Sequence, residues 1–234
     1  MITLDNLTLA YGTKTILEAA HTTFSRGTLT ALVGRNGSGK STLLRVLAAI
    51  DAPLSGSVLI DSKPLHSLAA VERAKVISFV STQRVRVANM RCQDVVATGR
   101  APYTNWLGAM QTEDSDIVRS ALAAVGMSEF ALRAIDTLSD GECQRVMIAR
   151  ALAQQTPVIL LDEPTAFLDI PTRFEICRLL AELAHTQGKT IIFSTHDTDA
   201  ALPVSDNVAV LENRALSLYS QAEATEVLKR LFAL

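Results

Sequence analysis

The sequence predicts an α/β fold with a mainly parallel sheet, an antiparallel β part at the N-terminus and an inserted α-helical subdomain. Continuous apolar runs carry the prediction of the sheet, because they are typical of parallel strands buried on both faces. A glycine or a polar side chain follows each run within three residues. The runs end at Val33, Val80, Leu161 and Phe193. Between residues 84 and 155 the apolar residues instead recur at the helical period, which predicts the helical subdomain.

The length of 234 residues suits one domain with an embedded subdomain. We expect a single domain over residues 1–234, with a core of residues 1–83 and 156–234 and a helical subdomain of about residues 84–155.

The first third of the chain contains short strands and one helix. Alternating apolar residues over 2–9 predict early strands that lead to Tyr11. The run over 29–33 predicts a buried strand, and a glycine-rich loop then leads into a helix over 40–50. Proline and glycine residues flank the apolar residues 58–60, which predicts a hairpin there.

The remainder of the chain contains helices and further strands of the parallel sheet. A strand is expected over 76–80, and a helix over 143–154 closes the helical subdomain. Strands follow over 158–161 and 190–193, and an amphipathic helix over 222–232 ends the chain.

Composition excludes several classes of protein. The net charge is −2, with 22 basic and 24 acidic residues, so no basic field indicates a nucleic-acid partner. Three cysteines are too few and too scattered for a disulfide framework or a metal cluster, which favours a reducing, cytosolic setting. We expect no signal peptide, because the N-terminus lacks a charged leader followed by an apolar stretch. We also expect no membrane span, because no window reaches about 18 uninterrupted apolar residues. A mean hydropathy of +0.24 is high, and we expect part of the apolar surface to meet partner subunits.

The most specific motif is the glycine-rich loop after the strand over 29–33. Its spacing is GxxxxGK[ST], in which backbone N–H groups close around a phosphate and the lysine reaches the terminal phosphates. A glycine-rich turn can be merely a turn, but the full spacing after a strand predicts a nucleoside triphosphate site. The loop consists of Gly34, Arg35, Asn36, Gly37, Ser38, Gly39, Lys40, Ser41 and Thr42. Ser41 is expected to ligate Mg²⁺, and Thr42 to reach the α-phosphate.

A second motif follows the run over 158–161, where Asp162 and Glu163 stand side by side. One carboxylate is expected near the Mg²⁺ ion and the other where a water molecule is activated. Open α/β sheets bind ligands at the carboxyl ends of their strands. We therefore expect one edge of the sheet to collect the residues that follow the four runs, namely Gly34, Gln83, Asp162 and His196.

A third motif, Leu138–Glu142, precedes the helix over 143–154. Ser139 followed three residues later by Glu142 fits a capping box at the start of a helix. A capped helix start that carries a glycine, here Gly141, is also an anion site, because free N–H groups and the helix dipole point outward.

With this third motif the sequence resembles the ATP-binding cassette (ABC) family, whose signature is written LSGGQ. The resemblance implies a P-loop NTPase with a RecA-like core, ATP and Mg²⁺ as cofactors, and a homodimer in which the signature of one subunit covers the ATP of the other. Asp140 replaces the first glycine of the signature and Glu142 replaces the glutamine. Both replacements add negative charge near a triphosphate, so we expect the isolated chain to close into the dimer reluctantly.

The resemblance extends to further positions and implies a role for each. Glu163 would be the general base or water-positioning residue, and Ser41, Gln83 and Asp162 would organise Mg²⁺. The partner subunit would contribute Ser139, Gly141 and Glu142, together with a loop over 166–169 that ends at Asp169. Tyr11 matches the family's aromatic residue that stacks on adenine. His196 matches the histidine that contacts the terminal phosphate.

The stretch Gly99–Tyr103 is similar to the Gly-Arg-x-Pro segment of importer ATPases for iron–siderophore, haem and cobalamin chelates. It can also be read as a turn between helices. The importer reading implies permease subunits that contact the helical subdomain and the Gln83 region, an indirect link to a substrate-binding protein, and a peripheral location on the cytoplasmic face of the inner membrane. A single-cassette ATPase of cell division or lipoprotein release is the alternative.

Overall fold

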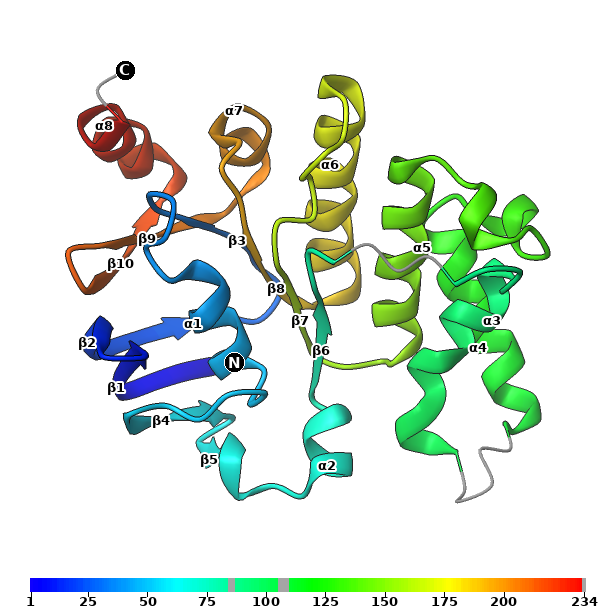
Figure 1. The fold of residues 1–234 in the computed structure, drawn as a ribbon, viewed down its shortest axis with the longest axis horizontal. Coiled ribbons are helices and arrows are strands. Elements are labelled where there is room, and N and C mark those ends of the chain that lie inside the picture. Colours follow the sequence, from blue (N-terminus) through cyan, green and yellow to red (C-terminus); the bar gives the residue numbers. More distant parts are fainter. Residues whose placement is uncertain (84–86, 105–109, 233–234) are drawn as a thin grey trace.

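The computed structural model describes residues 1–83, 87–104 and 110–232. Two sheets and a group of helices make up the fold (Figure 1). The larger sheet has six strands in the order β10-β9-β3-β8-β7-β6. Its strands are β3 (Leu29–Val33), β6 (Ile77–Val80), β7 (Val158–Leu161), β8 (Thr190–Ser194), β9 (Asn207–Glu212) and β10 (Ala215–Ser220).

The four apolar runs form parallel strands of this sheet, as predicted, and the structure places them next to one another. β8 pairs in parallel with β3 on one side and with β7 on the other, and β7 pairs with β6. Every residue of β3, β7 and β8 is buried. β9 extends the parallel sheet beyond β3, and β10 adds an antiparallel edge.

The smaller sheet is the predicted antiparallel part. Its order is β2-β1-β4-β5, formed by β1 (Ile2–Tyr11), β2 (Lys14–Phe24), β4 (Ser55–Ile60) and β5 (Lys63–Pro64). The alternating segment at the N-terminus forms one continuous strand rather than several short ones. β1 and β2 join in a hairpin whose register shifts more than once.

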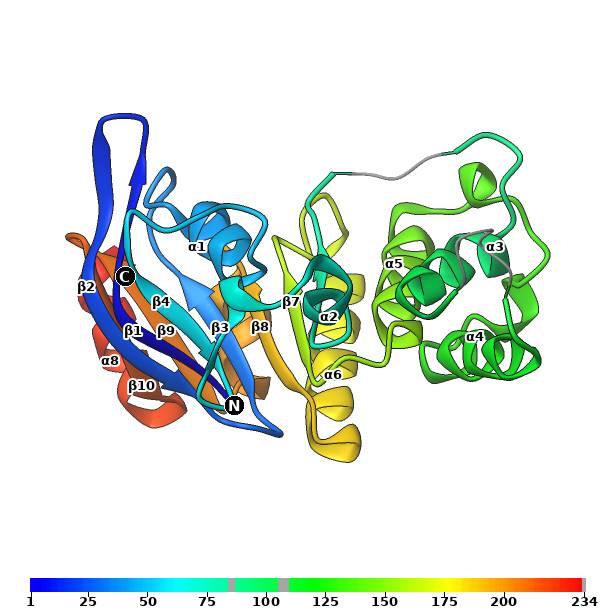
Figure 2. The ribbon, with the colours of Figure 1, turned by 90° about the horizontal axis from the view of Figure 1, so that it is seen from below.

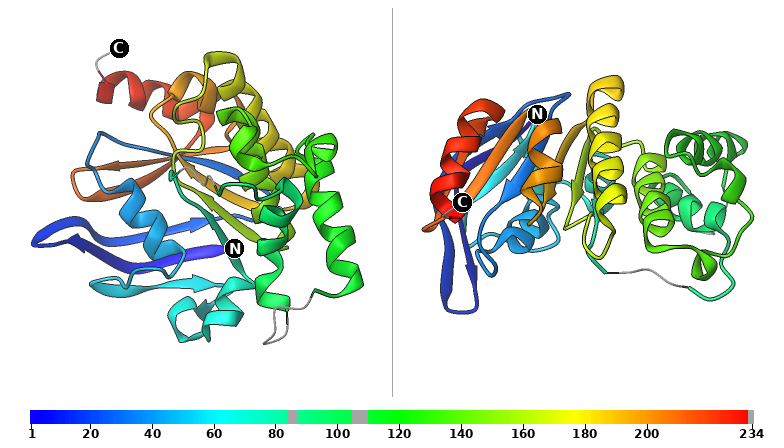
Figure 3. Two further views of the ribbon diagram at one scale, coloured as in Figure 1. Left: turned by 45° about the vertical axis from the view of Figure 1, so that its right-hand side comes forward. Right: turned by 90° about the horizontal axis from the view of Figure 1, so that it is seen from above.

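Helix α1 (Lys40–Leu47) lies between the two sheets (Figures 1 and 3). Its apolar side chains, such as Leu43 and Leu47, pack with one face of the larger sheet, including Leu32 and Ile192. The opposite face packs against α6 (Ile170–Gln187). α1 ends earlier than the expected residue 50, because the backbone turns to a positive φ of 52° at Ala49.

The helices between β6 and β7 form a separate group at the end of the molecule opposite β10 (Figures 2 and 3). They are α3 (Cys92–Ala97), the 3₁₀ segment Thr98–Tyr103, α4 (Thr112–Ala124) and α5 (Asp140–Ala153). α5 begins three residues before the expected start, because Ser139 caps it. The limits of the helical subdomain stay a prediction, since residue 84 lies outside the described residues.

Short helices complete the fold: α2 (Ala70–Ala74), α7 (Thr198–Ala201) and α8 (Gln221–Phe232), with 3₁₀ turns at Leu65–Ser67, Ser128–Phe130, Ile135–Thr137 and Leu202–Val204. Within the described ranges, no helix combines the length and the apolar character needed to span a bilayer.

A buried ion pair, which we call the Arg100 anchor, holds the helices to one another. The Arg100 side chain donates to Asp114 Oδ1 at 2.7 Å and to the backbone oxygen of Ala153 at 2.7 Å, and its guanidinium lies 4.0 Å from the Tyr103 ring centre. A Cβ atom on Gly99 would lie 2.3 Å from the Arg150 carbonyl oxygen, so only glycine allows this approach to α5. The Gly99–Tyr103 stretch therefore has a packing role.

The Arg100 anchor also connects to the sheet. The Tyr103 hydroxyl donates to the Gln154 carbonyl oxygen at 3.0 Å. The Gln154 side chain donates to the backbone oxygens of Ala74 and Ile77, at 2.6 and 3.0 Å. The end of α5 is thereby held at the start of β6.

Candidate functional site

The glycine-rich loop connects β3 to α1 in a conformation that only glycine permits at two points. A Cβ atom on Gly34 would lie 2.6 Å from the Leu211 carbonyl oxygen. Gly39 has a φ of +105°, and a Cβ there would lie 2.0 Å from a methyl group of Ile16. The loop therefore packs directly against β9 and β2, and α1 begins at Lys40 with its N-terminus facing the loop.

Lys40 is 5% exposed and folds back over the loop. Its ammonium group donates to the backbone oxygens of Gly34 and Arg35, at 3.0 and 3.5 Å. Burial lowers the pKa of Lys40 below its usual value, and the charges of Glu163 and Asp162 act in the opposite direction. The ammonium group thus sits inside the loop, in the field of both carboxylates.

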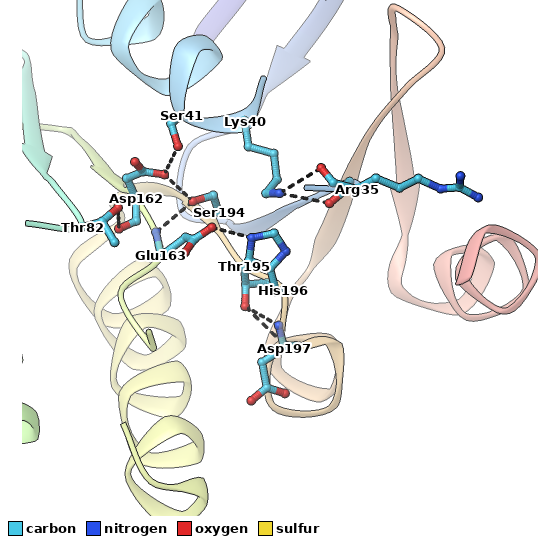
Figure 4. A network of polar contacts seen from close by, with 11 residues as sticks. Arg35, Lys40, Ser41, Thr82, Asp162, Glu163, Ser194, Thr195, His196 and Asp197 are labelled. Carbon is cyan, nitrogen blue, oxygen red and sulfur yellow. Dashed lines mark hydrogen bonds and ion pairs between the residues drawn. The ribbon is translucent and has the colours of Figure 1, made fainter. Parts of the chain in front are cut away.

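The two acids follow β7 and meet the loop through a hydroxyl network (Figure 4). Ser41 Oγ donates to Asp162 Oδ1 at 3.0 Å, and Ser194 Oγ donates to the same oxygen at 2.7 Å. The Glu163 backbone N–H donates to Ser194 Oγ at 2.8 Å. The segments that follow β3 and β7 are therefore joined by polar contacts with the end of β8, at the edge that the apolar runs predicted.

Glu163 and His196 form a partly exposed contact within this network. Glu163 Oε1 lies 2.5 Å from His196 Nε2, and their side chains are 28% and 43% exposed. Glu163 also has a φ of +49°, which is uncommon for a residue with a side chain. Backbone strain of this kind often occurs where a functional group is held in place.

A cavity of about 670 Å³ brings Tyr11 into the same site. Tyr11 is 75% exposed at the tip of the β1–β2 hairpin. The wall of the cavity consists of residues from the hairpin, the glycine-rich loop and the strand ends: Tyr11, Lys14, Ile16, Asn36, Gly37, Gly39, Lys40, Ser41, Thr42, Glu163 and His196. An aromatic ring thus lines the same cavity as Lys40 and Glu163.

Gln83 does not line the cavity around Lys40. It is exposed and lines a small pocket together with Asp140, Glu163 and Phe167. None of the hydrogen bonds described for the chain joins Gln83 to Ser41 or Asp162. Its neighbour Thr82 does reach the network, because its hydroxyl donates to the Asp162 carbonyl oxygen at 3.0 Å.

The capping box at the start of α5 forms as predicted. Ser139 Oγ accepts from the Glu142 N–H at 3.3 Å, while Glu142 Oε2 accepts from the Ser139 N–H at 2.8 Å and from its hydroxyl at 2.7 Å. The hydrogen bonds from the Ser139 hydroxyl and N–H hold the pKa of Glu142 below its usual value. The Glu142 carboxylate is therefore turned back onto its own helix.

Gly141 and Asp169 stand at neighbouring helix starts. A Cβ on Gly141 would lie 2.7 Å from the Thr172 methyl group, so α5 and α6 approach closely there. Asp169 caps α6 and accepts from the Thr172 N–H at 2.9 Å. In the described part of the chain, neither these residues nor Ser139 and Glu142 line the cavity around Lys40.

Ser194 and Thr82 contact the site but belong to none of its sequence motifs. Ser194 is a buried hydroxyl residue at the end of the apolar strand β8, two positions before His196. Its only signal in the sequence is a polar residue that ends an apolar run beside a candidate site residue.

Comparisons with known proteins agree with this geometry. The family model described as "ABC transporter" matches residues 17–166. The achromobactin transport ATP-binding protein of Dickeya dadantii is 37% identical over 97% of this chain and 84% of its own length. The ferric enterobactin transport ATP-binding protein of Escherichia coli is 34% identical over 98% of this chain and 86% of its own length.

A solved structure supports the same conclusion. An ATP-binding cassette in a dimeric post-hydrolysis state, bound to ADP and Pi, superimposes with a TM-score of 0.79 at 30% identity, over 94% of this chain and 99% of the other. The phosphate loop, the paired acids and these similarities together establish that the chain belongs to the ABC transporter family, as one of its ATP-binding, ATP-hydrolysing subunits.

Proposed function

We propose that the chain hydrolyses ATP as a homodimer and thereby energises the import of an iron–siderophore, haem or cobalamin-type chelate. The observation that carries the ATPase proposal is the hydroxyl network that joins Ser41 of the loop, Asp162 and Glu163. The choice of cargo is supported by the names of the relatives, which transport achromobactin and ferric enterobactin.

In this proposal, the glycine-rich loop holds the triphosphate. Backbone N–H groups of Gly37–Lys40 and the Lys40 ammonium neutralise the β- and γ-phosphates. Thr42 faces the α-phosphate, and Tyr11, which lines the same cavity, stacks on adenine. Arg35, Asn36 and Ser38 complete the loop.

Mg²⁺ fits the oxygen donors beside the loop. Magnesium is typically bound by one or two carboxylates together with substrate phosphates, rather than by a cage of protein ligands. Ser41 and Asp162 offer such donors, and within the described ranges no group of three or more His, Cys, Asp or Glu residues could hold a metal by itself. Ser41, Asp162 and Gln83 would hold the ion, which supplies positive charge to the phosphates.

Glu163 accepts the proton of the attacking water or orients that water toward the γ-phosphorus. His196 contacts the γ-phosphate and holds the Glu163 carboxylate through their existing contact. Phosphoryl transfer depends mostly on positioning and charge. Loss of Glu163 should therefore affect turnover far more than binding.

The second copy supplies the other wall of each site. The residues of the signature and of the loop before α6 do not line the Lys40 cavity of their own chain, which supports their acting on the nucleotide of the partner. They are Ser139, Gly141, Glu142 and Asp169. Because one chain carries the loop, Glu163, the signature and His196, a homodimer would hold two complete sites. The dimeric cassette with ADP and Pi supports this assembly.

The remaining partners are those of an importer. Permease subunits would contact the helical subdomain and the Gln83 region, and a substrate-binding protein would act through the permease. The dimer would then lie peripherally on the cytoplasmic face of the inner membrane. The transport names of the relatives support this location.

Vesicles that contain the permease and this chain test the proposal. Uptake of a radiolabelled ferric chelate, haem or cobalamin should require ATP and should stop with Glu163→Gln. ATP hydrolysis by the wild-type complex without uptake of any of these chelates would contradict the cargo class. Full hydrolysis by Glu163→Gln would contradict the role of Glu163.

A further inference from the structure

One buried hydroxyl connects the two acids of the site. Ser194 is fully buried at the end of β8, which pairs with both the strand before the loop and the strand before the acids. Its Oγ donates to Asp162 Oδ1 at 2.7 Å and accepts from the Glu163 N–H at 2.8 Å (Figure 4).

The direction of these two hydrogen bonds is fixed. A backbone N–H can only donate, so Ser194 Oγ must accept from Glu163, and its single proton goes to Asp162. Asp162 Oδ1 then has two hydroxyl donors, because Ser41 Oγ also donates to it at 3.0 Å. Ser194 therefore restrains the Asp162 carboxylate and the Glu163 backbone at once.

We propose that Ser194 is a positioning residue for ATP hydrolysis. It holds the Asp162 carboxylate beside Ser41, where Mg²⁺ is expected, and it anchors the positive-φ backbone that directs the Glu163 side chain toward His196. The inference rests on the proposed roles of Asp162 and Glu163, and it adds a residue outside every motif of the site.

A purely structural serine is the competing explanation, and the chain contains a matched control. Ser78 in β6 is 1% exposed and belongs to the same sheet. Its hydroxyl accepts from Thr156 Oγ1 at 3.1 Å and lies 3.5 Å from the Val158 carbonyl oxygen, at the start of β7 rather than at its end. Ser78→Ala removes a buried hydroxyl without touching either acid.

The test compares Ser194→Ala, Ser78→Ala and Glu163→Gln in the purified full chain. ATP hydrolysis is measured against ATP and Mg²⁺ concentration. Binding of Mn²⁺ in the presence of ADP is followed by electron paramagnetic resonance. Two controls report whether each variant is folded: ATP binding in the absence of metal, and the melting temperature. Removing the orienting partner of a metal ligand typically costs about 10–100-fold in metal affinity or activity.

Ser194→Ala should lower kcat about 10–100-fold and weaken Mn²⁺ binding about tenfold or more, with metal-free ATP binding unchanged. Ser78→Ala should keep kcat and Mn²⁺ affinity. Wild-type kcat and Mn²⁺ affinity in Ser194→Ala would overturn the inference, as would equal effects of the two serine substitutions. If Ser194→Ala is normal while Glu163→Gln is inactive, only this inference fails. If Glu163→Gln is active, the proposed function fails.

Discussion

The hydroxyl network around Asp162 and Glu163 and the Arg100 anchor are both polar clusters, but their charged side chains differ in burial and in partners. Arg100 and Asp114 are each only 5% exposed and pair with one another, and Arg100 also donates to the main chain. Glu163 and His196 contact each other with 28% and 43% of their side chains exposed. A buried charge with every partner supplied serves structure, whereas a half-exposed charge keeps room for a substrate.

The largest expected effect is on ATP turnover, from a substitution at Glu163 in the hydroxyl network. Glu163→Gln should lower kcat about 10²–10⁴-fold, the range for a lost general base, while ATP still binds. An ATP-bound dimer should accumulate and be visible by gel filtration. Glu175→Gln is the matched control, because Glu175 pairs with Arg145 on the surface of α6. Near-normal hydrolysis by Glu163→Gln would break the contrast between the two clusters.

The Arg100 anchor should show the opposite response. Asp114→Asn leaves a buried guanidinium without its counter-charge, which typically costs about 3–5 kcal/mol of folding free energy. Urea denaturation should report that loss, with the kcat of the folded fraction close to wild type. An unchanged urea midpoint would mean that the Arg100 anchor does not contribute measurably to the free energy of unfolding.

Low pH should remove the stability that the Arg100–Asp114 ion pair contributes to the wild-type chain. The hydrogen bonds from the Gln111 N–H and from Arg100 hold the pKa of Asp114 below its usual value. A depressed pKa in the folded state stabilises the fold above the unfolded pKa, and this contribution is lost as pH falls through the folded pKa. The stability difference between wild type and Asp114→Asn should therefore shrink in acid.

The start of α5 provides an intermediate test. Because the Glu142 carboxylate is bound by Ser139, we expect Asp140→Gly to raise ATP-driven dimerisation more than Glu142→Gln does. The gain should shrink at high salt if repulsion of the phosphates is the cause. Sedimentation at several protein concentrations measures it. A larger gain from Glu142→Gln would mean that its carboxylate leaves the capping box when the dimer closes.

The smallest effect concerns a thiol of the core. Burial raises the pKa of Cys177 to about 12, so its thiol should stay unmodified by iodoacetamide at about pH 8 in the folded chain. Mass spectrometry after alkylation, with a urea-unfolded sample as the control, checks this. Modification of Cys177 at the rate of the unfolded sample would contradict the packing of α6 against the sheet.

Much of the parallel sheet was predictable, because β3, β6, β7 and β8 are buried on both faces and so appear as continuous apolar runs. β2, β9 and β10 were not predicted. β2 changes register against β1, with a positive φ at Ala19, so its apolar residues lose strict alternation. The β9–β10 turn uses Asn213 and Arg214 at positive φ, without the glycine that usually marks such turns.

The site was likewise predictable only in part from the sequence. The residues brought together around Lys40 were those with a motif or a motif-like spacing, such as Asp162, Glu163 and His196. Ser194 was missed because its contacts depend on β8 lying between β3 and β7, and strand order cannot be derived from local pattern. The Arg100–Asp114 pair was missed for a related reason, since the partners meet only when the helices pack.

The strand order also has a consequence for synthesis of the chain on the ribosome. In the larger sheet, β3 pairs only with β8 and β9 among the described strands, and these begin at residues 190 and 207. A nascent chain that has emerged only as far as β7 therefore has its phosphate loop on a strand without neighbours in that sheet. We expect nucleotide binding to begin only after β8 and β9 have left the exit tunnel, so ATP should not act as a folding ligand before that stage.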